Sequence, residues 1–164
     1  MTATIDHRPG TFDRVDRVKA AVNEPALAGD DRLWILGGPL TATLHPAAGP
    51  AWTVTVPRGF VTDGASVPWT VQTVTGWRPW DEPQRWGAIV HDWLYSCNGR
   101  PVTDHPDLGV LPAVAKRDAD RAFRAVLQAA GAHPVRYTAM YLAVHLFAGL
   151  AYRSDQVTGP TVRV

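Results

Sequence analysis

One short segment of the chain, His-Asp-Trp-Leu-Tyr, concentrates side chains that can do chemistry: His91, Asp92 and Tyr95. On a helix Tyr95 follows His91 by one turn and lies on the same face, with Asp92 beside it. A histidine serves as general base when a third group orients its ring. Asp120, on a later helix, is placed to bond Nδ1 of His91 and leave Nε2 free. We therefore predict a catalytic group of His91, Asp120 and Tyr95.

The helix that carries the histidine is predicted over residues 84–96. It follows Asp81-Glu82-Pro83, an Asp cap with an early proline, and it ends before Asn98-Gly99. Its apolar residues recur at helical spacing and form a stripe that must face the core: Trp86, Ile89, Val90, Trp93, Leu94 and Cys97. The opposite face has Gly87 and Ala88 one turn before His91, where small side chains let a second helix or a substrate approach closely.

The elements around this helix predict an α+β fold. Between residues 32 and 57, apolar and β-branched residues alternate with period two between Gly and Pro, which is typical of two or three antiparallel strands. The run 59–68 is rich in turn formers and is expected to leave the sheet as an ordered loop. Helices are predicted over residues 84–96, 116–130 and 134–152, the second ending at Gly131. A small antiparallel sheet in the N-terminal half should thus precede a three-helix C-terminal half.

Length and composition indicate one domain. The chain has 164 residues, of which 46% are apolar, enough for one continuous core. We expect a single α+β domain over 31–155, an N-terminal arm or helix over 1–30, and a tail over 156–164. Within the first segment, apolar residues at helical spacing over 11–22 predict an amphipathic helix.

Charge and residue usage exclude several classes of protein. The formal net charge is +1 and the basic residues are scattered, so we expect no nucleic-acid partner. The single cysteine, Cys97, cannot form an internal disulfide and suits a reducing compartment. Residues 1–17 lack the apolar core of a signal peptide. The most apolar stretch, 137–152, is shorter than the ~20 residues that span a bilayer, so we expect no transmembrane segment.

Four blocks of sequence, in order, resemble a phage and prophage family called domain of unknown function 1353. The resemblance covers roughly residues 54–152, and its blocks are 56–68, 91–95, 119–123 and 140–147. It implies a phage-type protein, cytoplasmic in the host as synthesised or virion-associated, with phage structural proteins among its partners. His145 falls where this family often has arginine, so we assign it no catalytic role.

The pattern His-Asp-x-x-Tyr followed by an Asp on an antiparallel helix is also similar to the active site of phospholipase A2. That resemblance implies that His91 activates water, that Asp92 binds Ca²⁺, and that Tyr95 and Asp120 hold the histidine. The substrate would be a lipid or another ester. The disulfides beside the histidine and the Gly-rich calcium loop of that family are absent here.

Further oxygen ligands for Ca²⁺ are expected from the turn-rich loop. Calcium takes six to eight hard oxygens, and Asp63 with Gly64 and Ser66 could supply some of them. We therefore predict that the loop from Phe60 to Pro68 packs beside the N-terminal half of the helix over 84–96 and brings Asp63 or Ser66 near Asp92.

Three alternatives compete with this hypothesis. An HD-type phosphohydrolase needs an upstream histidine, and the candidates, His7 and His45, lie in a tail and a strand-like segment. A Ser66, His91, Asp120 hydrolase lacks the Gly that the nucleophile elbow requires after the serine. The third is a non-catalytic phage particle component or host-interaction protein, in which the His-Asp-Tyr cluster is a buried polar network that fixes helix packing.

Overall fold

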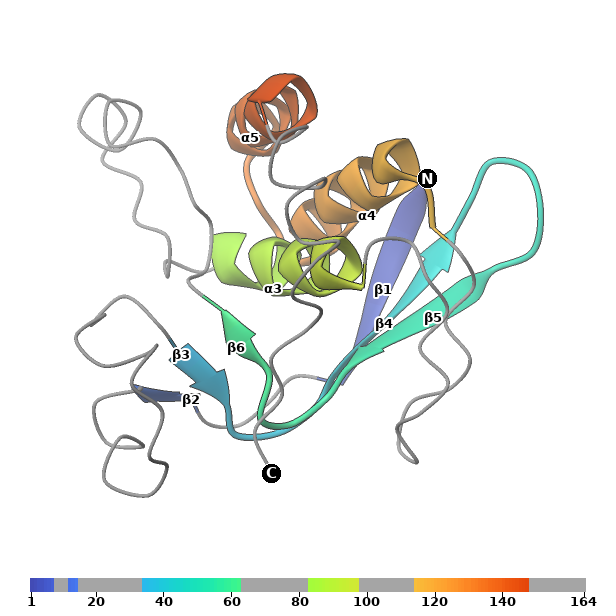
Figure 1. Ribbon diagram of the computed structural model, residues 1–164. Coiled ribbons are helices and arrows are strands. Elements are labelled where there is room, and N and C mark those ends of the chain that lie inside the picture. Colours follow the sequence, from blue (N-terminus) through green and yellow to red (C-terminus); the bar gives the residue numbers. More distant parts are fainter. Residues whose placement is uncertain (8–11, 15–33, 63–82, 98–113, 148–164) are drawn as a thin grey trace.

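The computed structural model describes residues 1–7, 12–14, 34–62, 83–97 and 114–147 (Figure 1). Its strands are β1 (Thr2–His7), β2 (Phe12–Arg14), β3 (Trp34–Leu36), β4 (Leu40–His45), β5 (Trp52–Val56) and β6 (Val61–Thr62). Its helices are α3 (Gln84–Ser96), α4 (Lys116–Ala129) and α5 (Pro134–Phe147). The predicted α+β class, with the sheet before the helices, is confirmed.

The main sheet is antiparallel with the strand order β1-β4-β5. Every second residue of β4 is buried, namely Leu40, Ala42 and Leu44, because successive side chains of a strand point to opposite faces. Leu40 lies opposite Val56 and Ala42 opposite Val54. On the other face, threonine hydroxyls of β4 and β5 pair across the strands. One apolar face is therefore available to the helices.

The first strand is the chief departure from the predicted fold. The arm or helix expected over residues 1–30 is wrong for β1, which pairs antiparallel with β4 and sets Ile5 opposite Ala42. The helix expected over 11–22 is likewise wrong at β2, and the rest of it lies outside the described residues. Period two explains β1, since Ala3 and Ile5 are half-buried while Thr2 and Thr4 are exposed. The expected division at residue 31 and the tail over 156–164 stay predictions.

A second small sheet, β2-β3-β6, continues from the first. The turn after β5 reaches it through Gly59, whose φ of +83° favours glycine. The amide of Gly59 donates to the carbonyl of Leu36, and the amide of Leu36 donates to that of Phe60. These bonds align β6 with β3 and direct Thr62 toward α3.

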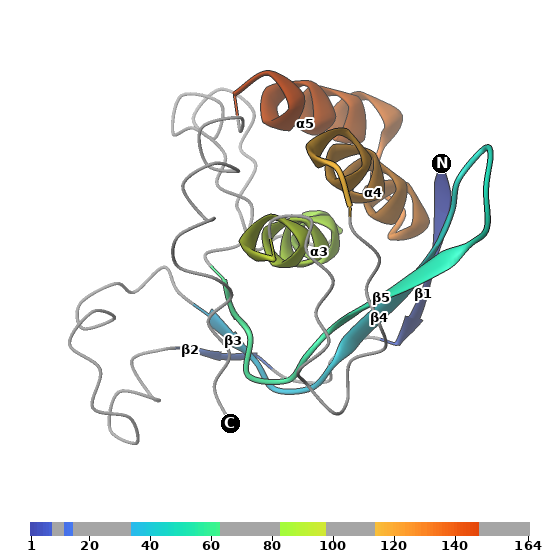
Figure 2. The same cartoon turned by 45° about the vertical axis from the view of Figure 1, so that its right-hand side comes forward.

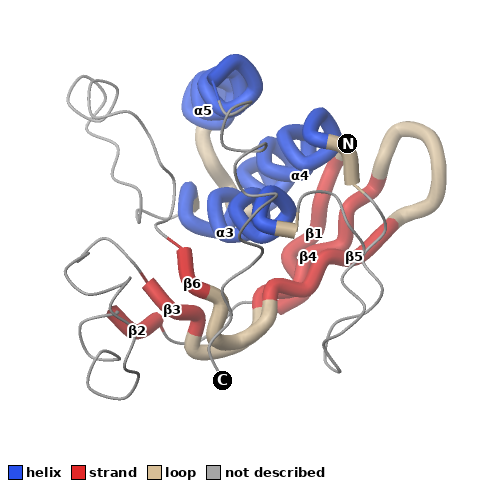
Figure 3. Tube along the Cα trace, in the orientation of Figure 1, coloured by secondary structure: helices blue, strands red, loops and turns tan. Residues whose placement is uncertain are grey.

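The helices stack in two layers above the sheet (Figure 3). Helix α4 packs on β1, α3 and α4 pack on each other, and α5 packs on α4. As predicted, Gly131, with φ +89°, terminates α4: the amide of Ala132 donates to the carbonyl of Leu127, and the amide of Gly131 to the carbonyl of Gln128. The N-cap of α3 is Pro83, without a side-chain cap. The expected Asp81 cap and the end of the last helix beyond residue 147 lie outside the described residues.

The small residues predicted on α3 admit a helix. A Cβ at Gly87 would lie 2.8 Å from both Cγ and Cδ2 of Leu127 and 3.1 Å from Cδ2 of Phe123, so α4 approaches the backbone of α3 directly. Ala88, in the same turn, is buried against the same residues of α4. Close packing here brings the polar residues of the following turn against α4.

Replacing Gly87 with alanine should therefore destabilise the protein. Within a helix Gly→Ala ordinarily adds about 0.5–1 kcal/mol of stability. Overpacking against the buried Leu127 should reverse that sign and cost about 1–3 kcal/mol, measured by urea unfolding. The control is Gln128→Ala, at an exposed position of α4, which should change stability by less than about 0.5 kcal/mol. A Gly87→Ala protein as stable as the parent would contradict the close approach.

Candidate functional site

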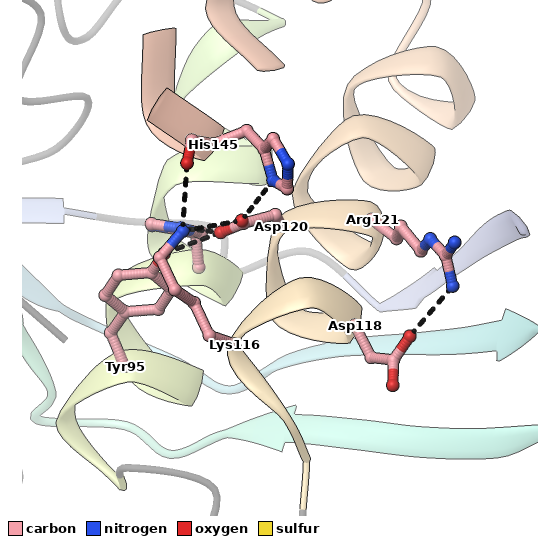
Figure 4. Close-up of polar contacts among 7 residues, drawn as sticks. Tyr95, Lys116, Asp118, Asp120, Arg121 and His145 are labelled. Carbon is pink, nitrogen blue, oxygen red and sulfur yellow. Dashed lines mark hydrogen bonds and ion pairs between the residues drawn. The ribbon is translucent and has the colours of Figure 1, made fainter. Parts of the chain in front are cut away.

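The centre of the site is the carboxylate of Asp120, which is fully buried in α4. Its Oδ1 accepts a hydrogen bond from the Tyr95 hydroxyl at 2.6 Å and lies 3.4 Å from Nε2 of His91. Its Oδ2 accepts one from Lys116 Nζ at 2.9 Å and lies 3.0 Å from Nδ1 of His145 (Figure 4). Side chains from three helices thus converge on one anion.

These contacts hold Asp120 in its charged form. Burial alone would raise the pKa of Asp120, but hydrogen bonds from His91, Lys116, Tyr95 and His145 keep it far below its usual 3.8. An ionised carboxylate only accepts hydrogen bonds. The ring nitrogens that face it, Nε2 of His91 and Nδ1 of His145, therefore carry the protons.

The structure brings His91, Asp120 and Tyr95 together as predicted, but through the other ring nitrogen. Nε2 of His91, and not Nδ1, faces Asp120. The reason is that the rotation of the His91 side chain decides which nitrogen faces α4, and helical spacing does not fix that rotation. The prediction of a free Nε2 is wrong, and the nitrogen left without an Asp120 contact is Nδ1.

The His91 ring is enclosed on its faces. Its centre lies 3.8 Å from that of Tyr95 and 5.3 Å from that of Phe123, and the residue is 7% exposed. Nδ1 lies 3.9 Å from Oδ1 of Asp92, a carboxylate whose side chain is 26% exposed. The ring is therefore fixed inside the protein, and its Nδ1 faces Asp92, which is partly exposed.

Asp92 is also tied to the end of the small sheet. The hydroxyl of Thr62, in β6, donates to Oδ2 of Asp92 at 2.5 Å. Nearby, the rings of Phe60 and Trp93 of α3 pack edge to face, with their centres 5.2 Å apart. The start of the predicted loop thus lies against the C-terminal half of α3 and not, as predicted, its N-terminal half, while Asp63 and Ser66 lie outside the described residues.

Opposing effects set the pKa of His91. Burial lowers it, but the contacts with Asp120 and Asp92, together with the charges of both carboxylates, outweigh burial and raise the pKa above 6.5. The imidazolium form is thus favoured by two anions, one on each nitrogen. A ring with a raised pKa accepts a proton readily, and it releases the proton only when the pH exceeds the ordinary pKa of histidine.

Sequence reasoning missed Lys116 and the contact made by His145. Lys116, four residues before Asp120 on α4, donates to its carboxylate. Lys116 also donates to the carbonyl of His145 at 3.2 Å. The i,i+4 spacing of Lys116 and Asp120 was a usable signal, whereas the approach of His145 depends on how α5 crosses α4.

The described residues do not by themselves make a metal site. None of the described His, Cys, Asp or Glu residues form a group of three able to hold an ion. Asp120 gives both oxygens to its four donors, and Asp92 already accepts from Thr62. The expected ligand Asp63 lies outside the described part of the chain.

Comparison with known proteins gives a family without an activity. The family model described as a protein of unknown function (DUF1353) matches residues 40–144, from β4 into α5. This confirms the family inferred from the motifs and extends the resemblance back to β4. No curated protein and no solved structure matches the chain.

Asp120→Asn should destabilise the protein strongly. It removes the charge that Lys116 and the two histidines share, and breaking a buried pair costs about 3–5 kcal/mol. The matched control is Asp118→Asn in the same helix. Its side chain and that of its partner Arg121 are partly exposed, so the expected effect is within about 0.5 kcal/mol (Figure 4).

The pH dependence of this difference follows from the two pKa shifts. Because the pKa of Asp120 is lowered in the folded protein, the ionised carboxylate stabilises the fold above pH 3.8, and this stabilisation is lost as the pH falls through the folded-state pKa. Because the pKa of His91 is raised, the protonated ring stabilises the fold below pH 6.5, and this stabilisation is lost as the pH rises through the folded-state pKa. Unfolding free energies of both variants across pH should thus differ most between 3.8 and 6.5. A flat difference would show that the charge of Asp120 is immaterial.

Proposed function

The chain belongs to the DUF1353 family, and we propose that it is an ester hydrolase with a phospholipase A2-like site in which His91 is the general base. The observation that carries the proposal is the orientation of the ring. Buried Asp120, itself held by Tyr95, fixes Nε2 and turns Nδ1 toward the partly exposed Asp92. Catalysis by a general base requires a second group that orients the base. Here Asp120 would orient His91, and Tyr95 would orient Asp120.

In the proposed reaction, Nδ1 of His91 takes a proton from a water molecule as its oxygen attacks the ester carbonyl. The resulting imidazolium is stabilised by the anionic Asp120 at Nε2, which stays ionised throughout. When the tetrahedral intermediate collapses, the same proton passes from Nδ1 to the leaving alkoxide. Acid and alcohol are released and His91 returns to its neutral form.

Calcium belongs to this proposal as a cofactor to be tested. Were it bound, it would polarise the ester carbonyl and stabilise the oxyanion. Asp92 is the described residue that would hold it, with Asp63 as the second predicted ligand. A phage or prophage origin, as the motifs imply, fits an enzyme that acts on lipid esters of a host.

A second candidate function rests on a different observation. All the acceptor capacity of Asp120 is used by donors from three helices, as in a closed network that fixes helix packing. The protein would then be a particle component or host-interaction protein without catalysis. The two candidates differ in what they predict for His91.

Turnover should depend on His91 and on its protonation. With a soluble short-chain phospholipid, kcat/KM should rise with pH through an apparent pKa above 6.5, since only the neutral ring accepts a proton. His91→Ala should lower kcat/KM by about 10²–10⁴-fold. The control, His133→Ala, removes an exposed histidine from the α4–α5 connection and should keep full activity.

Melting curves with calcium and with chelator separate the candidates. In the hydrolase, calcium stabilises only the folded state, by about 2.7 kcal/mol at a hundredfold excess over Kd. A closed network gives no ion response, no turnover in the parent protein, and a loss of about 1–3 kcal/mol in His91→Ala. That second pattern would refute the hydrolase.

A further inference from the structure

Helix α5 is apolar on the side that faces away from the protein. Its inner side packs Met140, Tyr137 and Val144 against Phe123 and Leu127 of α4. Its outer side carries a row with the spacing four, three, four: Val135, Ala139, Leu142 and Leu146. A helix that is apolar on both sides ordinarily has partners on both sides.

The exposure of this row is large and concentrated. Val135 is 68%, Leu142 48% and Leu146 68% exposed, and these are the large exposed apolar residues of the described part of the chain. Helix α5 forms the outermost layer, on the side of α4 away from α3 (Figure 2). The row therefore faces solvent along the helix, and a contiguous exposed apolar ridge marks an interaction surface.

The segment that contains α4 and α5 has more basic than acidic residues. Residues 116–147 hold five of the chain's 16 Lys and Arg residues but only two of its 15 Asp and Glu residues. The rest of the chain has eleven basic and thirteen acidic residues. One of its two acids is the buried Asp120, and α5 itself has none. On the side of α5 that faces α4, the Arg124 guanidinium lies 5.4 Å and 5.5 Å from the ring centres of Tyr137 and Tyr141. Apolar, aromatic and cationic groups thus lie together here.

We propose that the outer row of α5 docks the protein on an anionic lipid surface. The inference rests on the proposed function in taking a lipid ester as substrate. The ridge would enter the lipid and the Arg residues of α4 and α5 would contact its phosphates, as in helices that lie in a membrane interface. At about 1.5 Å per residue α5 is about 21 Å long, shorter than the ~30 Å apolar layer, so it would lie along the surface. No helix of the described residues is long and apolar enough to cross a membrane.

The site lies at one end of this ridge. His145 precedes Leu146 and contacts Asp120, and the carbonyl of His145 accepts from Lys116. The Asp120 cluster therefore lies beneath the last turns of α5, whereas Nδ1 of His91, on α3, faces Asp92.

A second copy of the chain fits the ridge less well. A helix face about 21 Å long and about 10 Å wide is far smaller than the roughly 800 Å² that each partner of a stable interface buries. Two copies would also bring together two faces with an excess of positive charge. A lipid surface has the complementary charge and no such area requirement.

The test uses the full chain and vesicles of ether-linked phospholipids, which hold no ester bond to hydrolyse. The parent protein should co-sediment with phosphatidylglycerol vesicles far more than with phosphatidylcholine vesicles, and less as salt rises. Val135→Ser/Leu142→Ser/Leu146→Ser should weaken partitioning at least tenfold. The matched control, Ala47→Ser/Ala48→Ser/Ala51→Ser, changes three exposed residues of the β4–β5 connection and should bind like the parent. Leu146→Ser alone should weaken partitioning in the same direction if the triple variant does not fold.

Equal binding by the parent and the α5 variants, or no binding by the parent, overturns the docking inference. So does analytical ultracentrifugation that finds a parent dimer and a monomeric triple variant. Turnover of a soluble short-chain phospholipid is measured in parallel. Turnover without vesicle binding refutes docking alone, whereas vesicle binding without turnover refutes the hydrolase and leaves the docking surface in place.

Discussion

A single buried anion organises the helical half of this protein. Asp120 has no contact with solvent, so its charge must be compensated by protein groups, and these come from α3, α4 and α5. This requirement fixes the relative rotation of the helices, because His91 and Tyr95 meet the carboxylate only if one face of α3 is turned toward α4. Gly87 removes the side chain that would keep α3 and α4 apart. The apolar core and the polar cluster thus impose the same packing.

Local patterns predicted much of this arrangement. Helical spacing gave α3 and α4 nearly to the residue, and period two gave β4 and β5, since both periods report which side of an element is buried. The association of His91, Tyr95 and Asp120 also followed from their faces. The ring nitrogen that meets Asp120 did not, because it depends on the rotation of one side chain. Lys116 and His145 were missed since their contacts arise from the crossing of α5 over α4. β1 was missed although Thr2 to Asp6 alternates, because so short a run is defined chiefly by its partner.

The cluster is divided between the two oxygens of Asp120. On Oδ1, His91 and Tyr95 belong to α3, whose far side reaches Thr62 through Asp92. On Oδ2, Lys116 and His145 join α4 to the last turns of α5. The carboxylate of Asp120 consequently links α5 to the small sheet through the ring of His91, which we propose as the base, and through Asp92. A displacement of α5 would alter the charge felt by His91 without any direct contact between them.

The pairing of β1 with β4 has a consequence for how the chain folds. β1 forms the edge of the main sheet, but its partner strand follows some forty residues later, and α4, which covers it, lies beyond residue 115. Such long-range contacts close large loops and slow folding. Until β4 and α4 have been synthesised, β1 lacks both of these partners, and its unpaired backbone groups can associate with other chains. Efficient production of the protein should therefore depend on rapid completion of the chain.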